Sequence, residues 1–264
     1  MKRTIYDFGA HNGDDIPYYL KKADVVVAVE ANPILCDSLR SKFNIELTAG
    51  RLYVENCVVT QGIEADVDFY INKYGNGSSQ FPKPKDRDME RFDKIVLPSL
   101  SATSIIRRYG EPFYIKIDIE HYDSAILRTL FLNDIYPKFI SAESHSIDVF
   151  ALLVACGRYN AFKLVEGSTV CKKYNNTPFT TKDGVREFYS FPYDSAGPFG
   201  EDIDGEWMIA DNFFLLLALE GLGWRDIHAT NIAEEKIKST RWKRLHFRNY
   251  LLKRLKIKLR RLIS

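Results

Sequence analysis

Two short stretches of the sequence carry side chains that could exchange protons. The first contains Asp118, Glu120 and His121, and the second contains Glu143 and His145. An aliphatic hydroxyl is a poor nucleophile, so a reaction at such a group gains from a base and from close positioning. His145 could take the proton, with Glu143 or Asp118 orienting its imidazole. Alternatively, His145 is a surface histidine at the start of the next helix. His121 is a weaker candidate for the base. The three carboxylates could instead bind a divalent metal through oxygen. Because no repeated carboxylate spacing requires an ion, we expect no metal site.

A turn bounded by two glycines near the N-terminus could bind a cofactor. The sequence predicts a buried strand at residues 4–8, a tight turn from Gly9 to Gly13, and a helix at residues 14–21. Glycine tolerates positive φ and lets a ligand approach the backbone, and a helix N-terminus offers free N–H groups. Strand, glycine turn and helix are the opening of a nucleotide-binding βαβ unit. The alternative is an ordinary turn of an α/β domain.

The residues around this turn favour S-adenosylmethionine over a dinucleotide. The dinucleotide fingerprint needs a middle glycine so that the backbone can reach a pyrophosphate, and this turn has none. Asp7 and Asp14 would repel a pyrophosphate, whereas they suit the ammonium and sulfonium groups of S-adenosylmethionine, and Asp14 could also cap the helix. The next apolar strand ends at Glu30, whose carboxylate can accept hydrogen bonds from both ribose hydroxyls.

The candidate residues follow predicted strands. Further strands are expected at residues 25–29, 51–60, 65–71, 94–97, 113–119, 138–142, 162–165 and 186–191. Helices are expected at residues 34–43, 102–109, 124–131, 147–156 and 207–219, the second of them capped by Ser101. Short strands alternating with helices indicate an α/β fold with a mostly parallel sheet and helices on both faces. Ligands of such sheets bind beyond the carboxyl ends of the strands, where the polar clusters and Asn56 fall.

Three motifs in this order resemble the FkbM family of methyltransferases. They are Asp7-Phe-Gly-Ala-His-Asn-Gly-Asp14, Val29-Glu-Ala-Asn-Pro33 and Lys116-Ile-Asp-Ile-Glu120, and Asn56 and the Ser78-Ser79 pair are similar to the family's sequence between them. The resemblance covers residues 4–144. The sequence departs from the family at His121, where glycine is usual, and at His11, where a smaller residue is common.

The resemblance implies a class I, Rossmann-like methyltransferase fold with S-adenosylmethionine as cofactor. It implies O-methylation of a hydroxyl on a sugar, glycan, polyketide or similar metabolite. It implies cofactor contacts from Asp7, Gly9, Ala10, Asn12, Gly13, Asp14, Glu30, Ala31, Asn56, Cys57 and Asp118. The catalytic candidates remain Asp118, Glu120, Glu143 and His145. A hypothesis from another class is a catalytically silent binding module with this fold, tethered to a membrane.

The charge is divided between an acidic body and a basic tail. Residues 236–264 hold 12 of the 37 Lys and Arg and no acid, so the rest of the chain has 25 basic and 35 acidic residues. Leucines in the tail follow helical spacing, at positions 245, 252, 255, 259 and 262. We expect a methyltransferase-like domain at 1–228 and a basic amphipathic helix at 229–264. An anionic membrane surface suits that helix best; docking on its own domain or a twin subunit comes second, and nucleic acid last.

The remaining composition favours a cytoplasmic protein. No apolar run reaches the length of a membrane span, and the first strand leaves no room for a signal peptide. The four cysteines lack C-x-x-C spacing, which argues against a zinc site and favours buried, reduced thiols. We expect a cytoplasmic enzyme, at the inner face of the membrane if its tail binds there. Its partner would be a small-molecule or glycan acceptor and not a nucleic acid, and the oligomeric state is left open.

Overall fold

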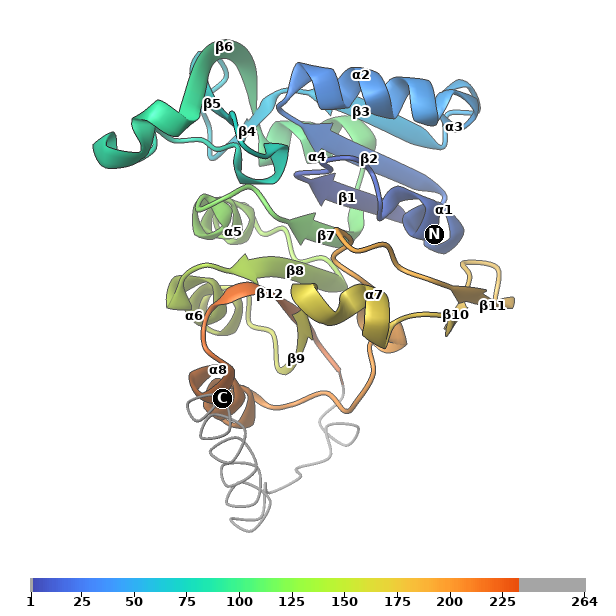
Figure 1. Cartoon of the computed structure of the whole chain (residues 1–264). Coiled ribbons are helices and arrows are strands. Elements are labelled where there is room, and N and C mark those ends of the chain that lie inside the picture. The colour runs from blue at the N-terminus through green and yellow to red at the C-terminus, as the bar shows by residue number, and fades with distance from the viewer. Residues whose placement is uncertain (1, 233–264) are drawn as a thin grey trace, which may run out of the picture.

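A seven-stranded sheet forms the centre of the protein. The computed structural model describes residues 2–232. The strands are ordered β3-β2-β1-β7-β8-β12-β9, from top to bottom of the sheet in Figure 1. Their bounds are β1 Thr4–Phe8, β2 Val25–Glu30, β3 Leu52–Asn56, β7 Pro112–Ile117, β8 Phe139–Ser144, β9 Ala161–Glu166 and β12 Gly223–Thr230. All pairings are parallel except those of β12, which runs antiparallel to both β8 and β9.

Helices cover both faces of the sheet, as predicted. Every residue of β1, β2 and β8 is buried, because strands covered on both sides present side chains to two cores. One core packs the sheet against α4 Ala102–Tyr109, α5 Asp123–Leu132, α6 Ile147–Ala155 and α8 Ala210–Glu220. The other packs it against α1 Ile16–Lys22, α2 Pro33–Lys42 and α7 Val170–Lys173. A short helix, α3 Asn44–Thr48, follows α2. The architecture is the class I, Rossmann-like fold expected from the sequence.

Helix boundaries follow their local chemistry. The hydroxyl of Ser101 accepts a hydrogen bond from Ser104 N at 3.0 Å, which confirms the predicted cap of α4. Gly110 follows the last residue of that helix with a φ of 101°, a conformation that favours glycine. At the start of α2, Asn32 caps the helix and Pro33 occupies the first turn. These local signals explain why the predicted helices lie close to the observed ones.

Two smaller sheets flank the central one, and here the sequence-based boundaries need correction. The strand expected at 51–60 is two strands, since the chain leaves β3 at Asn56 and enters β4 Val58–Thr60 in another sheet. The four-residue strand expected at 94–97 is the ten-residue β6 Phe92–Ser101, which pairs with β4 and with β5 Asp66–Asn72. A second small sheet pairs β10 Thr177–Thr180 with β11 Arg186–Tyr189.

The C-terminal part of the domain differs most from the prediction. The helix expected at 207–219 begins at Ala210, because Met208 forms a bridge with Phe162 instead. Strand β12 was not predicted at all, and it lies between β8 and β9. It continues through Thr230, so the expected domain boundary at 228 falls inside a strand of the central sheet. The first two residues of the predicted tail helix, 229 and 230, belong to β12, and residues 233–264 lie outside the described part of the chain.

Two further expectations concern membranes and thiols. Within residues 2–232, no helix is long and apolar enough to cross a membrane. Cys36 and Cys57 are buried as expected, but Cys156 is exposed and Cys171 is half-buried. The expectation that all four thiols are buried is therefore wrong, because Cys156 follows the end of α6 and lies at the surface.

Candidate active site

A cleft of about 420 Å³ opens at the carboxyl ends of β1, β2, β7 and β8. From the N-terminal half it is lined by Gly9, Ala10, His11, Asn12, Asp14, Asp15, Val29, Glu30, Ala31, Cys57, Val58, Val59, Phe69, Gly77, Ser78, Ser79 and Phe81. From the rest of the chain it is lined by Lys116, Asp118, Ile119, Glu120, Tyr122, Glu143, Asp194 and Trp224. Of the predicted site residues, Asp7, Gly13, Asn56 and His145 do not line the cleft.

At the two glycines of the first turn, other parts of the protein pack where a side chain would otherwise lie. Gly9 has a φ of +89°, and a Cβ there would lie 1.8 Å from the carbonyl oxygen of Asp118. Gly13 has a φ of +76°, and its Cβ would lie 2.5 Å from the side chain of Leu39. The expected positive φ is present at both glycines, and Gly9 also lines the cleft while it lets β1 approach the end of β7. Gly13 does not line the cleft, and its missing side chain lets the turn pack on α2 instead.

Glu30 is held at the end of β2 by the backbone. Its carboxylate accepts hydrogen bonds from His11 N and Asn32 N, both at 2.8 Å. Burial raises the pKa of Glu30, and these two N–H groups oppose the rise. Each carboxylate oxygen has a second lone pair, so the side chain can still accept hydrogen bonds from a ligand in the cleft.

Asn56 supports the turn that follows β2. Its amide donates to the carbonyl oxygens of Glu30 and Ala31, at 3.0 and 2.8 Å. The predicted contact of Asn56 with a cofactor is therefore replaced by a supporting role for the turn after β2. Cys57 does line the cleft, beside the apolar Val58, Val59 and Phe69, and burial raises its pKa to about 12.

A buried lysine, Lys116, links the first turn to β7. Its ammonium lies 3.4 Å from Asp7 and 3.2 Å from Asp118, and it donates to the carbonyl oxygen of Gly9 at 3.3 Å. Burial raises the pKa of Asp7 to about 7, and Lys116 opposes the rise. Asp7 is 1% exposed and faces Lys116. It does not line the cleft, so the structure does not support a direct contact with the cofactor, and a contact through water stays a prediction.

The first turn and α1 bring two more carboxylates to the cleft. Asp14 and Asn12 are joined by hydrogen bonds of 3.0 and 3.1 Å, and Lys42 lies 3.7 Å from Asp14. Asp15, which sequence reasoning missed, is buried and accepts hydrogen bonds from the Ser195 hydroxyl and from Ala196 N. Those partners lie 180 and 181 residues further along the chain, so no local signal could have identified them.

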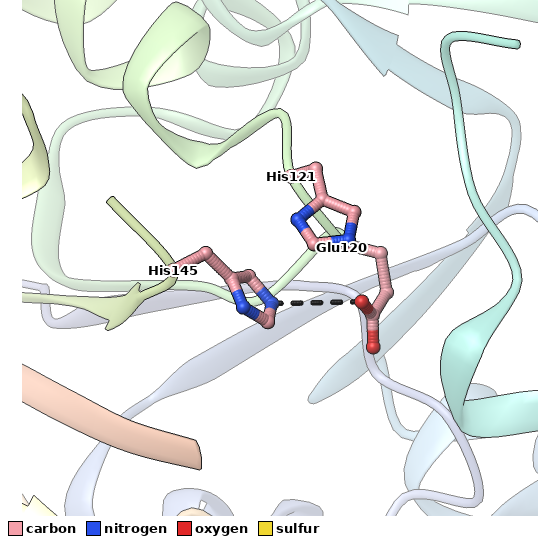
Figure 2. A group of neighbouring side chains, drawn as sticks. All are labelled: Glu120, His121 and His145. Atoms are coloured by element: carbon pink, nitrogen blue, oxygen red, sulfur yellow. Dashed lines mark ion pairs between the residues drawn. The ribbon is translucent and has the colours of Figure 1, made fainter. Parts of the chain in front are cut away.

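The acid–base candidates gather where β7 and β8 end. His145 Nε2 lies 2.7 Å from Glu143 Oε2 and 3.5 Å from Glu120 Oε2. Figure 2 shows Glu120, His121 and His145 converging on one point, with the rings of His121 and His145 4.5 Å apart. The two carboxylates raise the pKa of His145 to about 11, while burial raises that of Glu143 to about 7.

This arrangement changes the roles expected from the sequence. Asp118, Glu120 and Glu143 face the cleft, whereas His145 lies beside it. A protonated imidazole between two carboxylates cannot take another proton, so the structure does not support His145 as the base. Glu143 lines the cleft and His145 does not, so a ligand in the cleft would lie closer to Glu143 than to His145. His145 contacts the Glu143 carboxylate.

Comparison with known proteins identifies the family. Residues 7–157, more than half of the chain, match the methyltransferase FkbM domain. The chain belongs to the FkbM methyltransferase family. Its cofactor is S-adenosylmethionine. No curated protein matches the chain significantly.

Among solved structures, the chain is similar to methyltransferase FkbM from Methylobacillus flagellatus KT. The two share 16% identity with a TM-score of 0.42, over 62% of this chain and 40% of that one. It is also similar to precorrin-6y C5,15-methyltransferase from Geobacter metallireducens GS-15, with 10% identity and a TM-score of 0.37, over 88% and 81% of the two chains. A SAM dependent methyltransferase from Aquifex aeolicus shares 10% identity with a TM-score of 0.30, over 71% and 81%.

The cleft of this FkbM methyltransferase fits its cofactor. Asp7, Asp15, Asp118 and Asp226 all act electrostatically on the buried Lys116. The carboxylates of Asp14 and Asp118, which line the cleft, suit a ligand that carries an ammonium and a sulfonium. Glu30 would accept the ribose hydroxyls, and Asp14, Asp15 and Asp118 would face the cationic end.

Several cleft residues of this FkbM methyltransferase carry no sequence motif. Asp194 and Trp224 reach the cleft from beyond the matched segment, and Tyr193 contacts the Trp224 ring at 5.6 Å. Phe81 and Tyr122 also line it, with their rings 5.1 Å apart. Only folding brings these aromatic side chains to the cleft, so spacing in the sequence could not predict them.

Proposed function

We propose that the protein transfers a methyl group from S-adenosylmethionine to a hydroxyl oxygen of a sugar, a glycan or a similar polar metabolite. One observation carries this proposal. A second hollow of about 530 Å³ adjoins the cofactor cleft, and Ser78 and Glu120 line both. An acceptor in this second hollow, the acceptor groove, would meet the cofactor where Asp118, Glu120 and Glu143 converge.

The lining of the acceptor groove supports a hydrophilic acceptor. Its residues are Asn72, Ser78, Gln80, Pro82, Lys83, Pro84, Lys85, Arg87, Asp88, Arg91, Phe92, Glu120 and His121. Amides, hydroxyls and charged groups on this wall can hydrogen-bond the hydroxyls of a sugar, and a site built of such groups discriminates against analogues that lack them. An apolar acceptor would leave these polar groups without partners, which costs binding energy.

The residues take the following roles. When bound, S-adenosylmethionine supplies an electrophilic methyl group. Glu30 and the first turn hold the cofactor, and the acceptor groove holds the acceptor hydroxyl in line, since positioning contributes much of the rate. A new carbon–oxygen bond forms as the carbon–sulfur bond breaks. Glu143 faces the cleft and accepts the hydroxyl proton, and His145 fixes the orientation of that carboxylate.

The proposal is tested by methyl transfer from labelled S-adenosylmethionine to a panel of sugars, oligosaccharides, lipid-linked sugars and amines. We expect a labelled methyl ether and an equal amount of S-adenosylhomocysteine. The variant Glu143→Gln should bind the cofactor as the natural protein does and transfer about 10²–10⁴-fold more slowly. Transfer to amines alone would contradict O-methylation. Cofactor binding without transfer to any acceptor would favour the silent binding module.

The tail is the subject of a separate proposal. Residues 233–264 lie outside the described part of the chain, so what supports a membrane role is the sequence: 12 basic residues, no acid from 236 onward, and regularly spaced leucines. We propose that this segment brings the enzyme to an anionic membrane surface, near lipid-linked or membrane-proximal acceptors.

A further inference from the structure

Two imidazoles and a carboxylate meet beside the acceptor groove. Glu120 and His121 lie in the loop after β7, and His145 follows β8 (Figure 2). One ligand atom from each of the three lies within 4.8 Å of the others. Two histidines and one carboxylate are a recurrent ligand set for divalent transition metals. Shifts of about 1 Å would let all three atoms lie 2.0–2.2 Å from one central ion, the ligand-to-metal distance typical of zinc.

The backbone of the loop after β7 is held in an unfavourable conformation that presents these side chains. Glu120 and His121 have φ values of 46° and 68°, in the left-handed region that non-glycine residues avoid. Such a conformation is strained for a residue that carries a Cβ. A glycine at position 121 would remove that strain, so the imidazole is present despite a local penalty.

Further carboxyl groups surround the three residues. Asp118 and Glu143 line the neighbouring cleft, and the Asp123 carboxyl group is buried without a hydrogen-bond partner among the described residues. His145 Nε2 lies 2.7 Å from Glu143 Oε2 and 3.5 Å from Glu120 Oε2, so carboxylate oxygens already lie close to this nitrogen.

We propose that Glu120, His121 and His145 bind a divalent transition-metal ion, and that this ion coordinates the acceptor hydroxyl. The second half of this inference rests on the proposed function; the first half does not. Glu120 lines both the cofactor cleft and the acceptor groove, so an ion on its carboxylate sits between methyl donor and acceptor. A metal there polarises the bound oxygen and fixes its position.

The alternative to a metal ion at this site is a proton on His145. A protonated His145 would also offset the negative charge of Glu120 and Glu143, and this would require no contribution from His121. The two occupants therefore differ in whether His121 matters for binding. His121→Gly removes one metal ligand and also relieves the backbone strain. His11→Gly is a matched control, because His11 has a φ of 48° and belongs to the first turn.

The experiment is isothermal titration of zinc chloride into the full-length protein after treatment with EDTA, with cobalt(II) absorption as a second readout. We expect one zinc ion per chain. His121→Gly should raise the thermal midpoint and weaken zinc binding at least tenfold, because even residues that only support metal ligands are worth about 10–100-fold in affinity. His11→Gly should leave zinc affinity unchanged.

Absence of stoichiometric binding, or equal affinity in His121→Gly and the natural protein, would overturn the metal site. These measurements need neither cofactor nor acceptor, so they stand even if the proposed function fails. Methyl transfer by the natural protein should fall on removal of metal and return with added metal. Full transfer in the metal-free protein would overturn the role of the ion at the acceptor.

Discussion

Gly9 is the residue through which the cofactor turn and the catalytic strand meet. Its missing side chain lets the carbonyl oxygen of Asp118 approach, and Asp118 N in turn donates to Phe8 O at 2.9 Å. Gly9 N donates to Val29 O at the same distance. One residue thus fixes β1, β2 and β7 at the edge where the cleft opens.

Substituting Gly9 by alanine tests this close approach. Gly205 has the same φ of +89° but no atom within 4 Å of a Cβ, so Gly205→Ala isolates the backbone cost of about 1–2 kcal/mol. Gly9→Ala should lower the free energy of unfolding by at least about 1–3 kcal/mol more, because the backbone must move. Urea unfolding of both variants measures the difference. Equal losses would mean that the approach of Asp118 is unimportant.

Glu30 is the residue that the sequence singles out most directly for the ribose. A carboxylate that accepts charged hydrogen bonds contributes about 1.5–3 kcal/mol. Glu30→Gln keeps an oxygen for one of the two backbone N–H groups, so the fold should survive while S-adenosylmethionine binds at least about tenfold more weakly. Calorimetry measures the affinity, with Glu46→Gln on α3 as control. Unchanged affinity in Glu30→Gln would remove Glu30 from the cofactor site.

At the scale of an element, β12 completes the sheet and buries a histidine within it. His228 lies between Ser141 of β8 and Lys163 of β9 and is 2% exposed. Burial lowers its pKa from 6.5 to about 3, and Lys163 acts in the same direction. The ring is therefore neutral in the folded protein, whereas the unfolded chain takes up a proton below pH 6.5.

This difference predicts a loss of stability in acid. Because the folded pKa is depressed, His228 costs nothing above pH 6.5, and its cost grows as the pH falls toward 3. Between pH 6 and pH 5 the cost should grow by about 1 kcal/mol. Buried carboxylates such as Asp7, whose pKa is raised, act in the opposite direction. A comparison of the natural protein with His228→Gln therefore isolates the histidine.

The measurement is urea unfolding of both proteins at pH 7, 6 and 5. We expect the advantage of His228→Gln over the natural protein to grow as the pH falls. Parallel pH profiles for the two proteins would show that His228 is already protonated in the fold or reaches solvent.

At the scale of the whole molecule, an acidic body precedes a basic tail. Each Lys or Arg near an anionic bilayer contributes about 1 kcal/mol, and the attraction fades within a Debye length of about 10 Å at 0.1 M salt. The 12 basic residues of 236–264 therefore suffice for binding even if only half of them engage. The leucines would add burial among the headgroups.

Truncation before residue 233 tests the tail in co-sedimentation with liposomes. The full chain should bind vesicles that contain anionic lipid, release in high salt, and bind neutral vesicles weakly. The truncated chain should stay in the supernatant and keep its affinity for S-adenosylmethionine. Equal behaviour of both chains with anionic vesicles, or unfolding of the truncated one, would contradict the membrane role.

The sequence by itself determined what depends on neighbours along the chain. Strand, glycine turn and helix around Gly9, the acidic end of β2 at Glu30, and the cap at Ser101 all follow from residues within a few positions of one another. The alternation of strands and helices likewise determined the parallel sheet, because buried strands need a helix on each face.

Only the tertiary structure decided which of these groups face a ligand. The carboxylate of Asp7 pairs with Lys116, and the amide of Asn56 donates to the backbone of the turn after β2. Both follow because a buried polar group needs a partner, and the fold supplies these. Asp15 found its partners 180 residues away, and β12 entered the sheet against the direction of its neighbours. His121 and His145 meet because parallel strands end at one edge of the sheet, a proximity that exists in space and not along the chain.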